Sequence, residues 1–328
     1  MNKQPNISLE EFQNLPTEEV ARLVRAAGPK VCVFPINGTR RWFMLEHPPQ
    51  STKDLASAYL ELMTECYARI FQLVFEHGVD TLLTPIFGPD LMERGEDYTR
   101  VAVEGLTRLT NYPLFLDFYE TYEVRLHFYG DYRKFLNPTP YAYLSDLFTE
   151  ATARTLKHKR NRLFVGLFAH DATENVAEIA VRFYQEHGHL PNKRQVVETY
   201  YGEFVKPVDF FIGFDRPAAF DMPLIATGSE DLYFTVAPSP YLEAHTLRTI
   251  LYDHLYLRHV DESSYVELSS DDQCQMAEFY TLNRRSVLGV GRQDNSGHFW
   301  YPLPQVELPL CLSEKPGRRE ELFVSYSP

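Results

Sequence analysis

Two adjacent arginines, Arg40 and Arg41, follow Gly38 directly after the first strongly apolar segment of this 328-residue chain. That segment, residues 30–35, has the composition of a buried strand. Backbone N–H groups in the turn behind it can form an anion-binding nest, and guanidinium groups match phosphate oxygens in a two-pronged geometry. A solvated basic turn would have the same composition. The position directly after the first strand of a parallel sheet nevertheless favours a phosphate site.

Polar side chains also follow the later apolar segments of the chain. Ligands of open α/β sheets bind beyond the carboxyl ends of the strands, so these residues are further candidates for a site. They are Asp90, Glu93, Asp131, His170, Asp171, Asp215 and Arg216. Asp171 has an alternative role, because an aspartate at the start of a helix commonly caps it.

The alternation of apolar runs and amphipathic stretches predicts how these residues are positioned. Residues 53–77 carry apolar side chains at three- and four-residue steps, which indicates a helix that ends at Gly78. Strands are predicted at 30–35, 81–87, 124–129, 163–168, 208–213 and 231–236, and further helices at 97–109, 114–122, 144–156, 174–187 and 247–257. This order predicts an α/β fold: a single domain with a mainly parallel sheet of about six strands and helices on both faces.

The two ends of the chain differ from this regular middle part. Residues 1–29 are expected to form a polar, helical lead, residues 30–260 the α/β domain, and residues 261–328 a C-terminal extension. Residues 302–328 are rich in proline and charge, which predicts a partly disordered tail or an arm on a partner.

The composition excludes several classes of protein. The 45 acidic residues outnumber the 32 lysines and arginines, and the net charge of −13 argues against a nucleic-acid partner. No apolar run reaches the ~18 residues of a membrane-spanning helix, and no signal peptide is recognisable, so no stable membrane insertion is expected. The four scattered cysteines indicate reduced thiols and a cytoplasmic protein. Aromatic residues make up 14% of the chain and supply many π faces for a ligand.

Residues 37–42, Asn-Gly-Thr-Arg-Arg-Trp, resemble the Asp-Gly-Asn-x-Arg-Trp loop with which cis-prenyltransferases bind an isoprenoid diphosphate. The chain is more similar still to an offshoot of that superfamily, the diterpene synthases of the tuberculosinol (tuberculosinyl-adenosine) synthase and kolavelool synthase group. The resemblance spans roughly residues 20–300 and includes the blocks 28–31, 38–43, 75–78, 128–132, 200–203, 211–214, 232–239 and 250–254. It implies the α/β fold of the undecaprenyl diphosphate synthase-like superfamily, with residues 30–260 as the catalytic domain.

The resemblance also implies a reaction. A bicyclic diterpene diphosphate of labdane or clerodane type would be ionised, and water would capture the allylic cation to give a diterpene alcohol and diphosphate. Prenyl transfer to a nucleoside or another small acceptor is a second interpretation, and a non-catalytic partner subunit of an active relative is a third. A separate diterpene cyclase would have to supply the substrate, because the chain has no Asp-x-Asp-Asp motif. A homodimer is expected from the resemblance alone.

Individual residues receive roles from the same resemblance. Arg40 and Arg41 would hold the diphosphate, and Asn37 would orient it. Tyr59 would face the cation, unless it is an ordinary core residue of its amphipathic helix. Further substrate contacts are expected from Gly38, Thr39, Trp42, Phe87, Asp90, His170 and Phe214.

Three departures from the family pattern bear on magnesium and on the reaction. Asn37 replaces an aspartate, and residues 89–93 retain only Asp90 and Glu93 of an aspartate-rich segment, so Mg²⁺ binding by these two is an open prediction. Asp231 lies where chain-elongating relatives have a metal-binding glutamate, although a surface aspartate at a strand start is the alternative. Residues 215–223 lack the arginine-rich motif that binds a second diphosphate, which argues against chain elongation.

Overall fold

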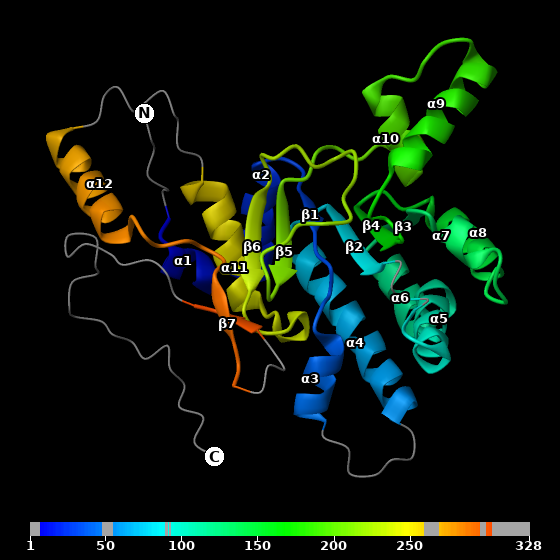
Figure 1. Cartoon of the computed structure of the whole chain (residues 1–328), viewed down its shortest axis with the longest axis horizontal. Coiled ribbons are helices and arrows are strands. Elements are labelled where there is room, and N and C mark those ends of the chain that lie inside the picture. Colours follow the sequence, from blue (N-terminus) through cyan, green and yellow to red (C-terminus); the bar gives the residue numbers. More distant parts are fainter. Residues whose placement is uncertain are drawn as a thin grey trace. The chain divides into compact units, whose positions relative to one another are not determined.

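A six-stranded sheet lies within the larger of two units in the computed structural model (Figure 1). The units comprise residues 3–259 and 260–328. The structure describes residues 7–47, 55–88, 91, 93–258, 269–295 and 300–303. Of the predicted C-terminal tail, residues 304–328 lie outside the described residues.

All strands of this sheet run parallel, in the order β3-β4-β2-β1-β5-β6. They are β1 (Val31–Val33), β2 (Thr81–Phe87), β3 (Val124–Tyr129), β4 (Asn161–Leu167), β5 (Phe210–Phe214) and β6 (Asp231–Thr235). Every residue of β1 is buried, as expected of a central strand whose two faces are both covered. The predicted fold class, an α/β domain with a six-stranded parallel sheet, is confirmed.

Helices connect the strands and cover the sheet. They are α1 (Leu9–Asn14), α2 (Thr17–Ala26), α3 (Thr39–Glu46), α4 (Leu55–Glu76), α5 (Glu96–Asn111), α6 (Pro113–Thr121), α7 (Tyr132–Leu136), α8 (Leu144–Thr155), α9 (Thr173–His187), α10 (Lys193–Tyr201) and α11 (Ala244–Tyr252). The short helices α3, α7 and α10 were not expected from the sequence. In the described part of the chain, no helix is long and apolar enough to cross a membrane.

Two hydrophobic cores flank the sheet. The larger core joins side chains of α4, α6, α8 and α11 to one face of the strands, with Phe71, Phe115 and Phe148 completely or almost completely buried. The smaller core joins Val31 and Leu83 to α10 and to Val205 and Val208, which follow α10 in the sequence. Helix α10 lies beside α9 (Figure 1).

The smaller unit contains a helix and a hairpin among its described residues. Helix α12 (Ser270–Asn283) begins at Ser269, whose side chain accepts a hydrogen bond from the backbone of Asp272 in a capping box. Strands β7 (Gly291–Gln293) and β8 (Trp300–Pro302) pair in antiparallel orientation.

The strand order determines which loops meet at the carboxyl edge of the large sheet. Strand β1 lies between β2 and β5, with Val33 opposite Leu83 on one side and Phe211 on the other. The turn after β1 therefore lies between the segments that follow β2 and β5.

Candidate active site

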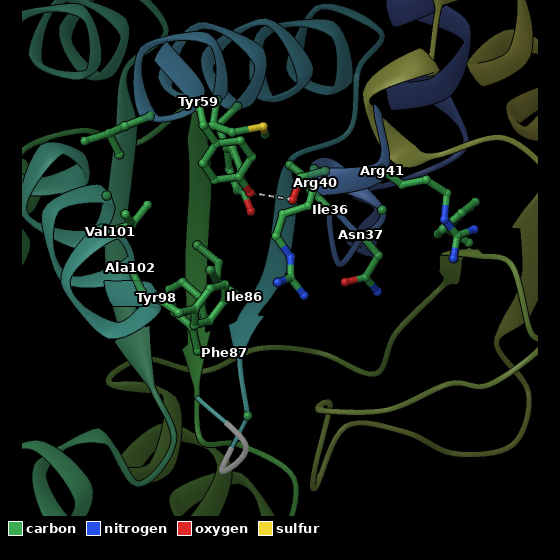
Figure 2. A pocket seen from close by; sticks show the side chains of 18 of the residues that line it. Ile36, Asn37, Arg40, Arg41, Tyr59, Ile86, Phe87, Tyr98, Val101 and Ala102 are labelled. Atoms are coloured by element: carbon green, nitrogen blue, oxygen red, sulfur yellow. Dashed lines mark hydrogen bonds between the residues drawn. The ribbon is translucent and has the colours of Figure 1, made fainter. Parts of the chain in front are cut away.

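A cavity of about 920 Å³ opens at this carboxyl edge (Figure 2). Its walls come from the turn after β1, from α3, α4 and α5, from the end of β2 and from the segment after β5. Eight of the residues given a catalytic or substrate-binding role from the sequence line it: Asn37, Gly38, Thr39, Arg40, Arg41, Tyr59, Phe87 and Phe214. The volume is near the upper end of the range for small-molecule sites, about 300–1,000 Å³.

Gly38 holds the turn after β1 in a conformation that other residues rarely adopt. Its φ is +75°, and a Cβ atom built on it would lie 2.7 Å from Cε1 of Phe214 and 2.9 Å from Cβ of Pro238. The neighbouring residue is fixed as well, because the N–H of Asn37 donates to Oγ of Ser239 and the N–H of Ser239 donates to the carbonyl of Asn37, both at 3.0 Å. The turn is therefore held against two distant segments of the chain.

Helix α3 begins in this turn without a side chain that caps it. Its first turn contains Arg40 and Arg41 and no acidic residue. Cations are unfavourable at the positive end of a helix, so this arrangement is a local conflict that a bound anion would relieve. The free N–H groups and the two guanidinium groups together favour a phosphate ligand.

The two arginines leave α3 in different directions (Figure 2). Arg40 extends in the same direction as Asn37, and its Cζ lies 5.1 Å from the centre of the Tyr98 ring. Arg41 extends away from them; its Cζ lies 5.4 Å from the Phe214 ring, and its Nη1 lies 3.4 Å from Oδ2 of Asp215. The cavity thus has guanidinium groups on two of its sides.

Helices α4 and α5 supply an apolar and aromatic part of the cavity. Ala102 and Gly105 on α5 line it with a methyl group and with bare backbone, which leaves space between the two helices for a bulky ligand. The other apolar and aromatic residues here are Leu60, Met63, Tyr67, Val101, Leu106 and Leu109, and Phe115 joins them from α6.

Tyr59 connects α4 to the turn after β1. Its hydroxyl lies 2.8 Å from Oγ1 of Thr39, and its ring packs edge-on against Phe43 with 5.3 Å between the centroids. Burial raises the pKa of Tyr59, so the hydroxyl is neutral at pH 7. The residue belongs both to the hydrophobic packing and to the cavity lining.

Other residues assigned from the sequence lie away from the cavity lining. Trp42 packs against the larger core and against His47, with 5.6 Å between the ring centroids. His170 is exposed after β4. Asp171 accepts hydrogen bonds from the N–H and Oγ1 of Thr173 at the start of α9, which is a local, cap-like role.

Of the acidic residues assigned to a metal, the two that the structure describes, Glu93 and Asp231, are not brought together. Asp231 begins β6 opposite Phe210, which places it at the amino edge of the sheet, whereas the cavity lies at the carboxyl edge. There its Oδ2 is 2.7 Å from Nδ1 of His254. Glu93 is exposed and does not line the cavity, and Asp90 lies outside the described residues.

The residues that the structure describes do not form a complete metal site. No group of three or more histidine, cysteine or acidic side chains among them could hold a metal ion. Asp215 is the one carboxylate in the described lining, and it contacts Arg41. Magnesium commonly uses one or two carboxylates plus substrate phosphates, so the described residues leave Mg²⁺ as a prediction that rests on the family.

Sequence reasoning missed Arg94 and Tyr98, and it did not connect Asp215 and Arg216 to the turn after β1. Nη1 of Arg94 donates to the Tyr98 hydroxyl at 2.9 Å, and both side chains line the cavity. Their position after β2 was the available signal, because the carboxyl edge of the sheet was already expected to hold the ligand.

The chain is similar in sequence to two characterised proteins, and no protein-family model covers it. A comparison with protein-family models found no match. A tuberculosinyl adenosine transferase from Mycobacterium tuberculosis is 43% identical over 287 residues, which cover 87% of this chain and 95% of that protein. A (+)-kolavelool synthase from Herpetosiphon aurantiacus is 24% identical over 305 residues, which cover 91% of this chain and 96% of that protein.

Two solved structures share the fold. Lavandulyl diphosphate synthase from Lavandula x intermedia, in complex with dimethylallyl diphosphate, matches 72% of this chain and 98% of its own with a TM-score of 0.52 and 15% identity. A probable undecaprenyl diphosphate synthase from Campylobacter jejuni matches 71% of this chain and 97% of its own with a TM-score of 0.50 and 13% identity. These likenesses show the cis-prenyltransferase fold.

Proposed function

This chain belongs to the family of the tuberculosinyl adenosine transferase and is an enzyme of cis-prenyltransferase fold, and we propose that it transfers a bicyclic diterpenyl group from an allylic diphosphate to a small acceptor. The more similar of the two curated relatives is a transferase, which favours transfer over capture of the cation by water. The observation that carries the proposal is the union of an anion-binding turn with a large, partly apolar cavity.

The diphosphate would bind at the start of α3. Arg40 and Arg41 would neutralise the charge that develops on the leaving group when the carbon–oxygen bond breaks and its electron pair moves to the diphosphate. The uncapped N–H groups of α3 would add donors that are already oriented. Asn37, whose backbone is fixed by Ser239, would offer its side-chain amide to a phosphate oxygen.

The hydrocarbon would occupy the space between α4 and α5. The rings of Tyr59, Tyr67, Tyr98 and Phe115 would face the allylic cation with their π electrons and shield it from water. Burial raises the pKa of Tyr59 and of Tyr67, so neither hydroxyl would supply a negative charge that traps the cation early.

Formation of a diterpene alcohol is a second candidate function. The relative named (+)-kolavelool synthase favours it, and it requires the same ionisation. Only the nucleophile differs, because water would replace the acceptor.

Two partners follow from the proposal. The bicyclic donor would come from a separate cyclase, and the enzyme would form a homodimer as the resemblance implies. Light scattering tests the dimer, because a particle of 38.1 kDa would be a monomer.

The experiment that tests the function supplies the purified protein with geranylgeranyl diphosphate, tuberculosinyl diphosphate and a clerodane-type diphosphate. Each is incubated with and without adenosine, in magnesium and in EDTA, and diphosphate release and products are followed by mass spectrometry. We expect release from a bicyclic donor and, with adenosine, a product that absorbs like a purine. Absence of diphosphate release from every donor would contradict the proposal. An alcohol as the sole product, whatever the acceptor, would establish the second candidate.

A further inference from the structure

The two helices that precede the sheet are attached to the larger unit by a buried arginine and a buried histidine. Arg248 on α11 is 9% exposed, and His77, directly after α4, is 2% exposed. Nη1 of Arg248 donates to the carbonyls of Gln13 and Leu15, at 2.5 and 2.8 Å, and Nη2 donates to Oγ1 of Thr17 at 2.9 Å. These residues form the junction of α1 and α2, so one guanidinium group holds both helices.

The third nitrogen of this guanidinium group contacts His77. Nε of Arg248 lies 3.2 Å from Nε2 of the imidazole, and Nδ1 of the imidazole lies 2.7 Å from the carbonyl oxygen of Leu73. A carbonyl oxygen can only accept a hydrogen bond, so Nδ1 carries the proton. An arginine nitrogen can only donate, so Nε2 carries none. Both partners therefore require the same neutral tautomer of His77.

A second proton on the imidazole would break this arrangement. It would set an N–H of His77 against the N–H of Arg248 and add a positive charge beside a buried guanidinium group. Burial lowers the pKa of His77; the hydrogen bond to Leu73 opposes this effect, the charge of Arg248 adds to it and the charge of Glu76 opposes it. From α2, Arg25 is a further cation at this end of α4, where it donates to a backbone carbonyl at 3.2 Å.

The lowered pKa determines the sign of the pH dependence. A histidine in an unfolded or opened segment has a pKa of about 6.5, so the closed state of α1 and α2 binds fewer protons than the opened state. Attachment of the two helices is therefore complete above about pH 6.5 and weakens as the pH falls below it. One proton changes the opening equilibrium by up to about tenfold per pH unit, until the pKa of the closed state is reached.

Opening of α1 and α2 would expose apolar side chains without disturbing the sheet. Phe12, Val20 and Val24 are completely buried and belong to the larger core. Helix α1 lies against α11 (Figure 1), and the ring of Phe12 packs on that of Tyr252 with 5.7 Å between the centroids. The strands of the sheet lie between residues 31 and 235, so their hydrogen bonds do not depend on either helix.

We propose that His77 and Arg248 form a pH-sensitive latch that keeps α1 and α2 attached above about pH 6.5 and releases them in acid. The trigger is one proton on Nε2 of His77, and the element that responds is the junction of α1 and α2. The latch goes beyond the proposed reaction, since neither residue lines the cavity.

Hydrogen exchange of the full chain from about pH 5 to about pH 8 tests the latch. Rates are divided by the intrinsic rate at each pH, and amides of α1 and α2 are compared with amides of β4. The variant His77→Gln has a side-chain donor and acceptor but no titration in this range. The matched control is His245→Gln, because His245 is an exposed histidine on the helix of Arg248, with its Nε2 3.3 Å from Nε2 of Gln13.

In wild type we expect opening of α1 and α2 to increase by up to about tenfold per pH unit below about pH 6.5, while β4 stays protected. His77→Gln should abolish this pH dependence, and His245→Gln should retain it. Nuclear magnetic resonance of isotope-labelled histidines in wild type should show the Nδ1–H tautomer of His77 at neutral pH, which decides the matter even if His77→Gln does not fold.

Three results would overturn the inference. The first is opening of α1 and α2 that does not change with pH, or that keeps the wild-type pH dependence in His77→Gln. The second is a neutral His77 protonated on Nε2, because Arg248 could then not donate to it. The third is an equal increase of exchange in β4, which would mean that acid unfolds the larger unit as a whole.

Discussion

The two edges of the parallel sheet hold arginines in opposite settings. At the amino edge, Arg125 and Arg162 stand near the starts of β3 and β4, and both bind the half-buried carboxylate of Glu203. At the carboxyl edge, Arg40 lies over the ring of Tyr98, and no carboxylate contacts it in the described part of the chain. An aromatic face holds a guanidinium group in place while leaving its N–H donors free for a ligand.

This difference separates arginines that maintain the fold from arginines that serve the proposed reaction. Charges paired inside the protein stabilise it and are costly to break singly. Charges held on rings at a helix start contribute little to folding, and in the proposed reaction they would bind the diphosphate. Substitutions at the two edges should therefore have opposite consequences for stability and for turnover.

The largest effect is expected when Arg40→Ala and Arg41→Ala are combined. Each substitution removes charge-assisted hydrogen bonds to the leaving group worth about 1.5–3 kcal/mol, so diphosphate release should fall by a factor between about 150 and 25,000. The thermal midpoint should change little, because neither side chain maintains a buried pair. Release assays and thermal unfolding on the same samples check both statements. Arg22→Ala, which removes an exposed arginine bound to Glu19, is the control. Unimpaired turnover of the double variant would remove the proposed role of α3.

Gly38→Ala should damage both properties, because this turn belongs to the fold and to the site. Its positive φ and the close approach of Phe214 together predict a loss of about 3 kcal/mol in the free energy of unfolding. Binding of inorganic diphosphate should weaken as well. Urea unfolding and calorimetry measure the two effects. Gly228→Ala is a matched control, because Gly228 has a φ of +81° but nothing within 4 Å of its would-be Cβ. Equal losses in the two variants would show that the contact with Phe214 is unimportant.

Glu203→Gln probes the amino edge and should lower stability without affecting the proposed reaction. Burial alone would raise the pKa of Glu203, but the hydrogen bonds and charges of His127 and Arg162 outweigh it and lower the pKa to about 2. A lowered folded-state pKa means that the stabilisation is complete above the unfolded value of about 4.3 and disappears as the pH falls toward 2. The variant should lose about 2 kcal/mol at pH 7 and less at lower pH. Denaturation across this pH range tests the sign: a loss that grows toward acid would contradict it.

Tyr59→Phe should have the smallest effect. The variant loses the hydrogen bond with Thr39 but keeps the ring, so turnover should fall about threefold to tenfold. Tyr59→Leu removes the π face as well, so its turnover should fall further. Steady-state kinetics of both variants test whether the ring faces the cation. Equal losses of turnover in Tyr59→Phe and Tyr59→Leu would mean that it does not.

The sequence predicted the parts of the molecule that local patterns specify. The apolar residues 31–33 and 81–87 and the periodic helix up to Glu76 determine strands and helices by themselves. Gly38, Arg40 and Arg41 could be placed at the carboxyl edge of the sheet because they follow a strand directly, and their role as an anion site stays a prediction. The short helix α3 was missed, since its eight residues carry no capping side chain.

The rest depends on strand order and direction, which local patterns do not specify. Asp215 reaches the turn after β1 only because β5 is the neighbour of β1 in the sheet. His170 follows β4, which is separated from β1 by β2, and it remains exposed away from the cavity lining. Asp231 has a side chain suited to a metal, but it begins its strand, and in a parallel sheet that end faces away from the site.

The missing cap of α3 has a consequence for the life of the protein in a cell. A helix that lacks a side-chain cap and carries arginines at its positive end would be completed by the diphosphate that is proposed to bind there. Under the proposed function, binding and local folding would be thermodynamically linked, so the supply of substrate would also set how often this edge of the sheet opens. At a low concentration of the diphosphate donor, α3 would unfold locally more often and be cleaved by proteases more often. The abundance of the enzyme would then follow the supply of its donor.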